Sequence, residues 1–152
     1  MNFNHEKNGE LLANRSILAA SELPIEPATI CEGIALLVSN DMNTEAAEMA
    51  DLAVGMFPNN PDLLWMGALV AQLTQDWQKA HDLLQQVKAI QGDDVELQTY
   101  QHLVRVLRCM ESEAEAVELI KLAMNRFPSD QVLQEEYEFL ISLQAQAVQQ
   151  PD

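Results

Sequence analysis

The sequence repeats itself with a period close to 34 residues. A slide of 34 residues places Ala46 on Ala80, and a slide of 36 residues places Ala80 on Ala116. The first and third copies also end alike, because Pro58 and Pro128 each follow a phenylalanine and lie twelve residues beyond the aligned alanine. A chain made of such copies buries the apolar face of each copy against its neighbours. The period therefore restricts the fold to a stack of similar units.

Each copy has the pattern of two helices. In the middle copy, residues 60–87, apolar and small residues recur every three or four positions on both sides of a short polar turn, which is the period of half-buried helices. The run Asn60-Pro61-Asp62 predicts a helix start, because it supplies a capping oxygen, a proline suited to the first turn and a carboxylate at the positive end of the dipole. The repeated unit is therefore a helical hairpin, and the predicted fold class is all-α.

The alanine and proline positions carry a family resemblance. They read Ala46, Ala50, Ala53 and Pro58 in one copy and Ala116, Ile120, Ala123 and Pro128 in another. At these residues the sequence resembles the tetratricopeptide repeat (TPR), a 34-residue helix-turn-helix unit with small residues where its helices touch. The run Asp76 to Ala80 is similar to the start of the second helix in that family. Departures from the pattern are Gly92 in the place of a proline, two extra residues between the second and third copies, and Val104 where a small residue is expected.

The resemblance implies three TPR-like hairpins in a short right-handed solenoid. We expect them at residues 27–60, 61–94 and 95–130, preceded by a flexible extension with a short helix (1–26) and followed by a capping helix and tail (131–152). The short helix, Gly9 to Ala20, either caps the solenoid or pairs with a partner or a second copy. The last helix needs a polar outer face, for which the sequence offers Gln134, Glu135, Glu136, Gln144 and Gln146.

Local patterns predict several details. Thr29 with Glu32, and Ser112 with Glu115, have the spacing of capping boxes. Ala46, Ala80 and Ala116 are expected where helices cross, and Gly33 and Gly67 where helices approach closely. Four methionines are expected to fill the core: Met49, Met56, Met66 and Met124.

Charge limits the kinds of partner. The net charge is -16, and no basic residue occurs between Arg15 and Lys79. Such a surface disfavours nucleic acids and anionic lipid. The apolar runs are far shorter than the roughly 20 residues of a membrane-spanning helix, and no secretion signal is recognised. We therefore expect a cytoplasmic protein whose cysteines, Cys31 and Cys109, are reduced thiols.

The sequence offers no set of residues typical of catalysis. The three histidines, His5, His81 and His102, have none of the spacings of a metal motif. A nucleophile elbow, a phosphate loop and a cysteine-histidine pair are also missing. We expect a protein that is not an enzyme and that holds no cofactor or metal.

The resemblance places a partner-binding groove on the first helix of each hairpin. Projected onto this sequence, the groove positions are Cys31, Ala35, Val38, Trp65, Leu69, Gln72, Gln101, Arg105 and Arg108. Such a groove would suit an extended or helical peptide with apolar anchors and a carboxylate or carbonyl that the arginines grip. Trp65 is either a binding hot spot or packs beneath the N-terminal helix. Arg105 and Arg108 either grip the peptide or are solvated charges.

These features predict a protein-binding module. In size, charge and layout the chain resembles the TPR-type chaperones of bacterial type III secretion, which keep translocator or needle subunits soluble before export. The alternative is an adaptor that is a permanent subunit of a larger cytosolic complex. A homodimer is left open.

Overall fold

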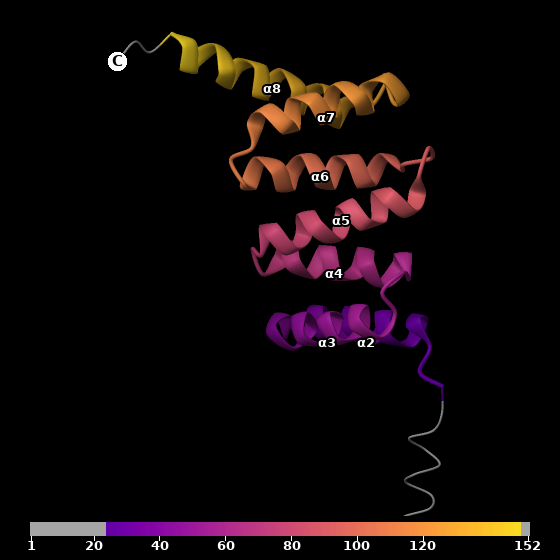
Figure 1. Cartoon of the computed structure of the whole chain (residues 1–152). Coiled ribbons are helices and arrows are strands. Elements are labelled where there is room, and N and C mark those ends of the chain that lie inside the picture. The colour runs from indigo at the N-terminus through magenta and orange to yellow at the C-terminus, as the bar shows by residue number, and fades with distance from the viewer. Residues whose placement is uncertain (1–23, 150–152) are drawn as a thin grey trace, which may run out of the picture.

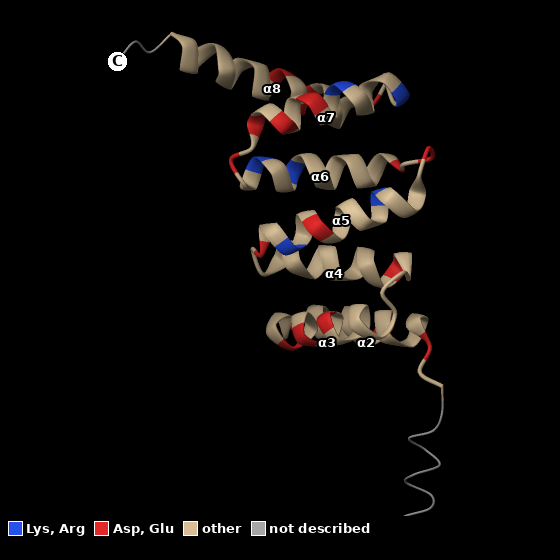
Figure 2. Cartoon of the chain, viewed as in Figure 1, with Lys and Arg blue, Asp and Glu red and all other residues tan. Residues whose placement is uncertain are grey.

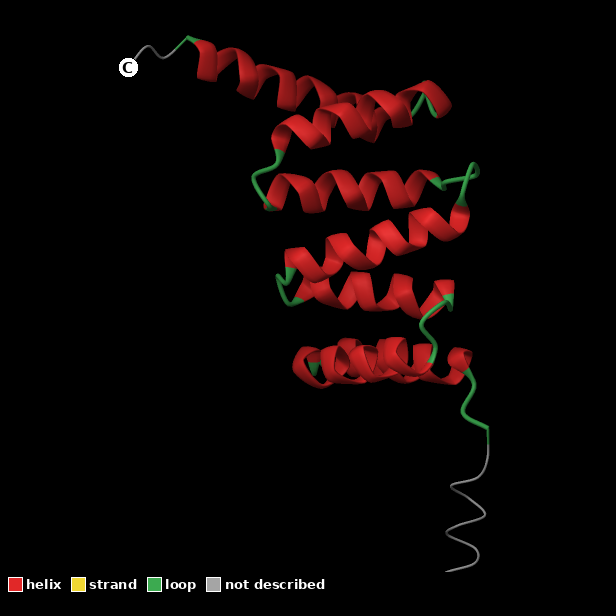
Figure 3. Ribbon diagram, in the orientation of Figure 1, coloured by secondary structure: helices red, strands yellow, loops and turns green. Residues whose placement is uncertain are grey.

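The computed structural model describes residues 24–149, and in this part of the chain every regular element is a helix (Figures 1 and 3). The helices are α2 (Pro27–Ser39), α3 (Asn43–Met56), α4 (Pro61–Leu73), α5 (Trp77–Gln91), α6 (Leu97–Cys109), α7 (Glu113–Arg126) and α8 (Gln131–Val148). The all-α repeat fold predicted from the sequence is confirmed.

The helices form consecutive hairpins that stack on one another. Figure 1 shows the stack running from α2 and α3, through α4, α5 and α6, to α7 and α8. The alanines of the repeat pattern, Ala46, Ala80 and Ala116, are fully buried. A methyl group on Gly67 would lie 3.1 Å from Leu83 Cδ1, and one on Gly33 would lie 2.9 Å from Met49 Cε. Small residues therefore lie where the helices approach each other, as the sequence predicted.

The core crosses from each hairpin to the next. Leu63 and Val70 of α4 belong to a core cluster whose other buried members come from α2 and α3. Val106 of α6 joins the cluster of α4 and α5, and Leu140 of α8 joins that of α6 and α7. From α4 onward, each first helix is thus held by the hairpin before it, which is the arrangement that makes repeat units depend on their neighbours.

The turn inside each hairpin has the same geometry. Asp41, Gln75 and Glu111 have φ values of 59°, 60° and 57°, in the left-handed region. In each turn the next residue donates its N–H to a carbonyl five residues earlier, as Asp76 does to Ala71 at 2.8 Å. This is the 6→1 bond of a Schellman motif, which normally has glycine at the left-handed position. The repeat thus preserves a turn conformation without a glycine.

Between the second and third hairpins, a glycine ends the helix. Gly92 has φ 62° and its N–H bonds to Lys88 O. The side chain of Gln91 then ties the following loop, because its Oε1 accepts from Glu96 N at 3.1 Å and from Thr99 Oγ1 at 2.9 Å. Gly92 and the hydrogen bonds of Gln91 thus shape this connection, where the connections after the other two hairpins contain a proline.

Some local expectations were wrong. Helix α2 begins at Pro27, so Thr29 lies inside it, and its N-cap Glu26 makes no side-chain cap bond. Ser112 is the N-cap of α7, yet its side chain makes no cap bond either. Asn60 does cap α4, accepting from Leu63 N at 3.0 Å.

Two side-chain placements also differ from expectation. Met56 is exposed rather than in the core. Glu136 is half-buried and faces α6 rather than the outer surface of α8. The expected helix Gly9 to Ala20 lies outside the described residues.

Charge is distributed unevenly along the stack. Figure 2 shows acidic residues and no basic ones on α3 and α4, with basic residues on α5, α6 and α7. Across residues 24–149, no helix combines the length and apolar character that a bilayer span requires.

Candidate functional site

The first helices of neighbouring hairpins contact one another through their side chains. Between α4 and α6, Trp65 and Gln72 both contact His102. Between α6 and α8, Gln101 donates to Asp130, and Arg108 to Glu136. We call this surface the first-helix face. It comprises the nine predicted groove residues and His102: Cys31, Ala35, Val38, Trp65, Leu69, Gln72, Gln101, His102, Arg105 and Arg108.

The α2 and α4 end of the face is apolar. Ala35 is exposed, while Cys31, Val38 and Leu69 are half-buried and thus partly open to solvent. Burial, and secondarily the nearby carboxylate of Asp62, raises the pKa of the Cys31 thiol. The thiol is therefore held in its protonated form, which is a poor nucleophile and behaves as a small apolar group.

An aromatic pair stands at the centre of the face. The rings of Trp65 and His102 are 5.1 Å apart between centroids at an interplanar angle of 79°, which is a favourable edge-to-face arrangement. His102 Nδ1 lies 3.1 Å from Gln72 Oε1. Burial, and then the charge of Arg105, lowers the pKa of His102. The neutral ring donates Nδ1–H to the Gln72 carbonyl, which orients the ring of His102 against Trp65, and part of the Trp65 surface stays exposed.

The two arginines of α6 differ in their surroundings. Arg108 Nη1 donates to both carboxylate oxygens of Glu136, at 2.8 and 2.6 Å, and its guanidinium carbon lies 4.6 Å from the centre of the Phe139 ring. Arg105 is exposed, and no carboxylate of the described residues pairs with it. Arg108 therefore fastens α8, whereas Arg105 keeps its charge available.

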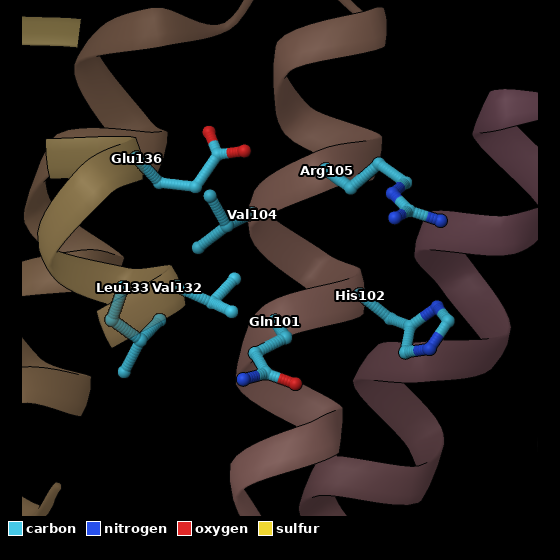
Figure 4. Close-up of a pocket in the computed structure, with 7 residues that line it drawn as sticks. All are labelled: Gln101, His102, Val104, Arg105, Val132, Leu133 and Glu136. Atoms are coloured by element: carbon cyan, nitrogen blue, oxygen red, sulfur yellow. The ribbon is translucent and has the colours of Figure 1, made fainter. Parts of the chain in front are cut away.

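A cavity of about 220 Å³ opens between α6 and α8. Figure 4 shows Val132 and Glu136 directed from α8 toward α6, while His102 and Arg105 project from α6 away from α8. The walls of the cavity combine apolar and charged side chains. Because its volume is below the usual range of small-molecule sites, the cavity suits one side chain of a ligand. The lining residues are Gln101, His102, Val104, Arg105, Val132, Leu133 and Glu136.

The polar groups of this face link neighbouring helices. His102 of α6 is in contact with an indole ring and an amide of α4. Within residues 24–149, no group of three His, Cys, Asp or Glu side chains could hold a metal ion.

Sequence reasoning missed four residues that shape this face: His102, Asp130, Glu136 and Phe139. His102 is adjacent in sequence to the predicted Gln101, so the helical period could have included it. The other three lie in or just before α8, and only the packing of α8 against α6 brings them to the face. Gln101 and Arg108, which were predicted to contact a ligand, are bonded to Asp130 and Glu136.

The fold has counterparts among solved structures, although no protein-family model and no curated protein matches the sequence. The first TPR of Spaghetti (RPAP3), bound to the HSP90 peptide SRMEEVD, is similar with a TM-score of 0.67 and 14% identity, over 78% of this chain and 92% of that one. The Sgt2 TPR domain of Aspergillus fumigatus gives 0.68 and 13%, over 86% and 89%. The Arabidopsis OM64 TPR domain gives 0.64 and 13%, over 76% and 93%. The chain therefore has the fold of the tetratricopeptide-repeat proteins.

Proposed function

We propose that this protein binds a segment of another polypeptide along its first-helix face. The observation that carries the proposal is the arrangement around Trp65. Its ring packs edge-on against His102, the half-buried Leu69 lies one turn further along α4, and Arg105 of α6 is exposed and pairs with no carboxylate of residues 24–149. A rigid aromatic anchor beside an available cation is typical of interface hot spots.

The chemistry of the face suggests what the ligand carries. Val38, Trp65 and Leu69 would cover apolar side chains of the client. Arg105 would accept a carboxylate by a bidentate contact, which a planar guanidinium favours. At the other end, the carboxylate of Asp62 on α4 would favour a neutral or basic residue of the ligand. The ligand is therefore an apolar segment whose acidic end lies at α6.

The finer role we propose is that of a cytosolic chaperone which holds a type III secretion substrate or apparatus subunit soluble before export. Its support is the size, charge and layout of the chain, with a net charge of -16 that would keep a complex dispersed. The peptide bound to the TPR of Spaghetti supports the peptide-binding step of this role.

The second candidate is a permanent adaptor subunit. It is favoured by large apolar side chains exposed on the second helices of the hairpins. They are Leu52, Met56, Ile90 and Leu122. In an adaptor these residues would be covered by a resident partner.

The two roles are separated by identifying what co-purifies stoichiometrically with the tagged chain from its native extract, with the mass of the complex measured by light scattering. A small exported protein that aggregates alone, and leaves the complex, is expected for a chaperone. Large resident proteins would instead establish the adaptor.

The binding face is tested with a matched pair of variants on the client so identified. Leu69→Asp should abolish binding, whereas Leu122→Asp, at an exposed position on α7, should leave it unchanged. Trp65→Ala should weaken binding by about 2 kcal/mol or more, the scale of a hot spot, with unchanged helicity. Equal affinities of Leu69→Asp and the wild type would refute the assignment of this face.

A further inference from the structure

Leu36 lies on a side of α2 that the later first helices bury. Its counterparts by repeat spacing are Val70 in α4, 34 residues on, Val106 in α6, 36 further, and Leu140 in α8, 34 further. Their exposed fractions are 1%, 0% and 0%, whereas Leu36 is 63% exposed. The first repeat therefore leaves open a face that is closed in every later repeat of the described chain.

The preceding hairpin is what closes this face in the later repeats. Val70, Val106 and Leu140 each belong to a core cluster of the hairpin before their own helix. A second position shows the same contrast, because Thr29 is exposed whereas its counterparts are fully buried: Leu63, Thr99 and Leu133. Among residues 24–149, no hairpin precedes α2, so the side chains of Thr29 and Leu36 are uncovered by this part of the chain.

We propose that residues 9–20 pack as a helix on this face, in the place that the second helix of a preceding hairpin would take. The segment carries the apolar residues that such a helix must bury, namely Leu11, Leu12, Ile17 and Leu18. Leu11 and Leu18 are seven residues apart and so lie on one side of a helix. A helix of this length is marginal alone, and the apolar face of α2 supplies the surface it needs.

The connection has the right length. Residues 21–26 join the segment to α2, which is six residues. The existing connections between one hairpin and the next helix are residues 57–60, 92–96 and 127–130, which are four or five residues long. Six extended residues span roughly 20 Å, about the length of the 13-residue helix α2. The segment therefore reaches the full length of the face without a strained link.

Charge favours this occupant over a second copy. Glu32 is exposed and lies one helical turn before Leu36 on the same side of α2. Lys7 and Arg15 are the only Lys or Arg residues before Lys79, and Arg15 lies within the proposed helix. In a twofold dimer through this face the same patch would meet itself, which would bring two acidic α2 helices together. The face differs from the first-helix face, so the inference holds whether or not the protein binds a client.

Hydrogen exchange of the full-length chain, followed by mass spectrometry, tests the inference. Amides of residues 9–20 should exchange at least tenfold more slowly than an unstructured peptide of the same sequence. Leu36→Asp should remove this protection. The control is Leu52→Asp, because Leu52 is 71% exposed and its counterparts Gln86 and Leu122 are exposed too, so protection should remain.

Several outcomes would overturn the inference: an unprotected wild-type segment, protection that survives Leu36→Asp, or protection that rises with concentration as light scattering reports a dimer. Protection that rises with concentration would mean that a second copy of the chain, rather than residues 9–20 of the same chain, covers the face. Circular dichroism establishes that each variant is folded.

A second readout is thermal. Combined Leu11→Asp and Leu18→Asp changes should lower the Tm by about as much as Leu36→Asp does, and all three together should lower it no further. Additive losses of Tm would show that the segment and Leu36 do not meet.

Discussion

The guanidinium of Arg108 and the carboxylate of Glu136 join α6 to α8, with Nη1–Oε distances of 2.8 and 2.6 Å. The pair is about one-third exposed on either side, and the Phe139 ring lies under the guanidinium. Because no second helix follows α8 in the described chain, this helix is held from one side only. A charged contact on that side therefore has a larger share in keeping α8 docked than a similar pair elsewhere on the stack.

We expect Arg108→Gln to loosen α8 more than it lowers global stability. Because the pair is partly exposed, its loss should lower the free energy of unfolding by only about 1 kcal/mol. Amides of α8 should nevertheless exchange faster, because the free energy of local opening of this helix falls. Hydrogen exchange of α8 peptides measures this. The control Lys121→Gln removes an exposed pair with Glu118 and should leave α8 unchanged. Equal exchange of α8 in both variants would contradict the assigned role of Arg108.

His102 should make stability depend on pH in a defined direction. In the folded chain, burial and the charge of Arg105 lower the pKa of His102 below its ordinary value of 6.5. At a pH between the folded-state and the unfolded-state pKa, the unfolded chain therefore binds more protons than the folded chain. The contribution of neutral His102 to stability is therefore complete above pH 6.5 and is lost as the pH falls through the folded-state pKa.

The titration and a variant check this direction. Nuclear magnetic resonance of the His102 ring protons should give a pKa below 6.5, and a value at or above 6.5 would refute the burial argument. His102→Gln loses the edge contact with Trp65, which costs about 1 kcal/mol in a well-packed aromatic pair. Chemical denaturation should find the gap between wild type and variant smaller at pH 5 than at pH 7.5.

The hairpins could be predicted from the sequence because their signals are local and repeated. The apolar period, the Asn60 cap and the alanines each act within one hairpin. The failures were also local. The pattern of Thr29 and Glu32 is that of a capping box, yet Pro27 has already started the helix, and a capping-box pattern inside a helix is indistinguishable from one at its start.

The candidate face could be predicted only in part. The family resemblance assigned Trp65 and Arg105 to the first helices of their hairpins. The partners of Arg108 and Gln101 come from α8 and the residue before it, 28 and 29 positions away. Those contacts depend on the angle at which α8 packs on α6, which the sequence pattern does not specify. Whether the nine residues bind a partner stays a prediction.

The alanines at the helix crossings should not tolerate larger side chains. Ala80 is fully buried in the cluster of α4 and α5, so Ala80→Leu must displace its neighbours, at a cost of about 1 to 3 kcal/mol. Ala89 lies on the exposed side of the same helix, and Ala89→Leu should change stability by no more than about 0.5 kcal/mol. Urea denaturation measures both. If the two variants were equally stable, Ala80 would not be at a tight crossing.

The left-handed turns offer a way to stabilise the stack. Gln75 has φ 60°, a conformation that costs a side-chain-bearing residue about 1 to 2 kcal/mol, whereas glycine adopts it freely but loses more chain entropy on folding. The balance predicts that Gln75→Gly raises stability by about 0.5 to 1 kcal/mol, or roughly 1 to 4 °C in Tm for a chain of this size. Gln86→Gly, on the exposed face of α5, should lower stability by about 1 kcal/mol. Scanning calorimetry of both variants gives the comparison. A lower Tm for Gln75→Gly would mean that the glutamine side chain stabilises the turn by more than its backbone strain costs.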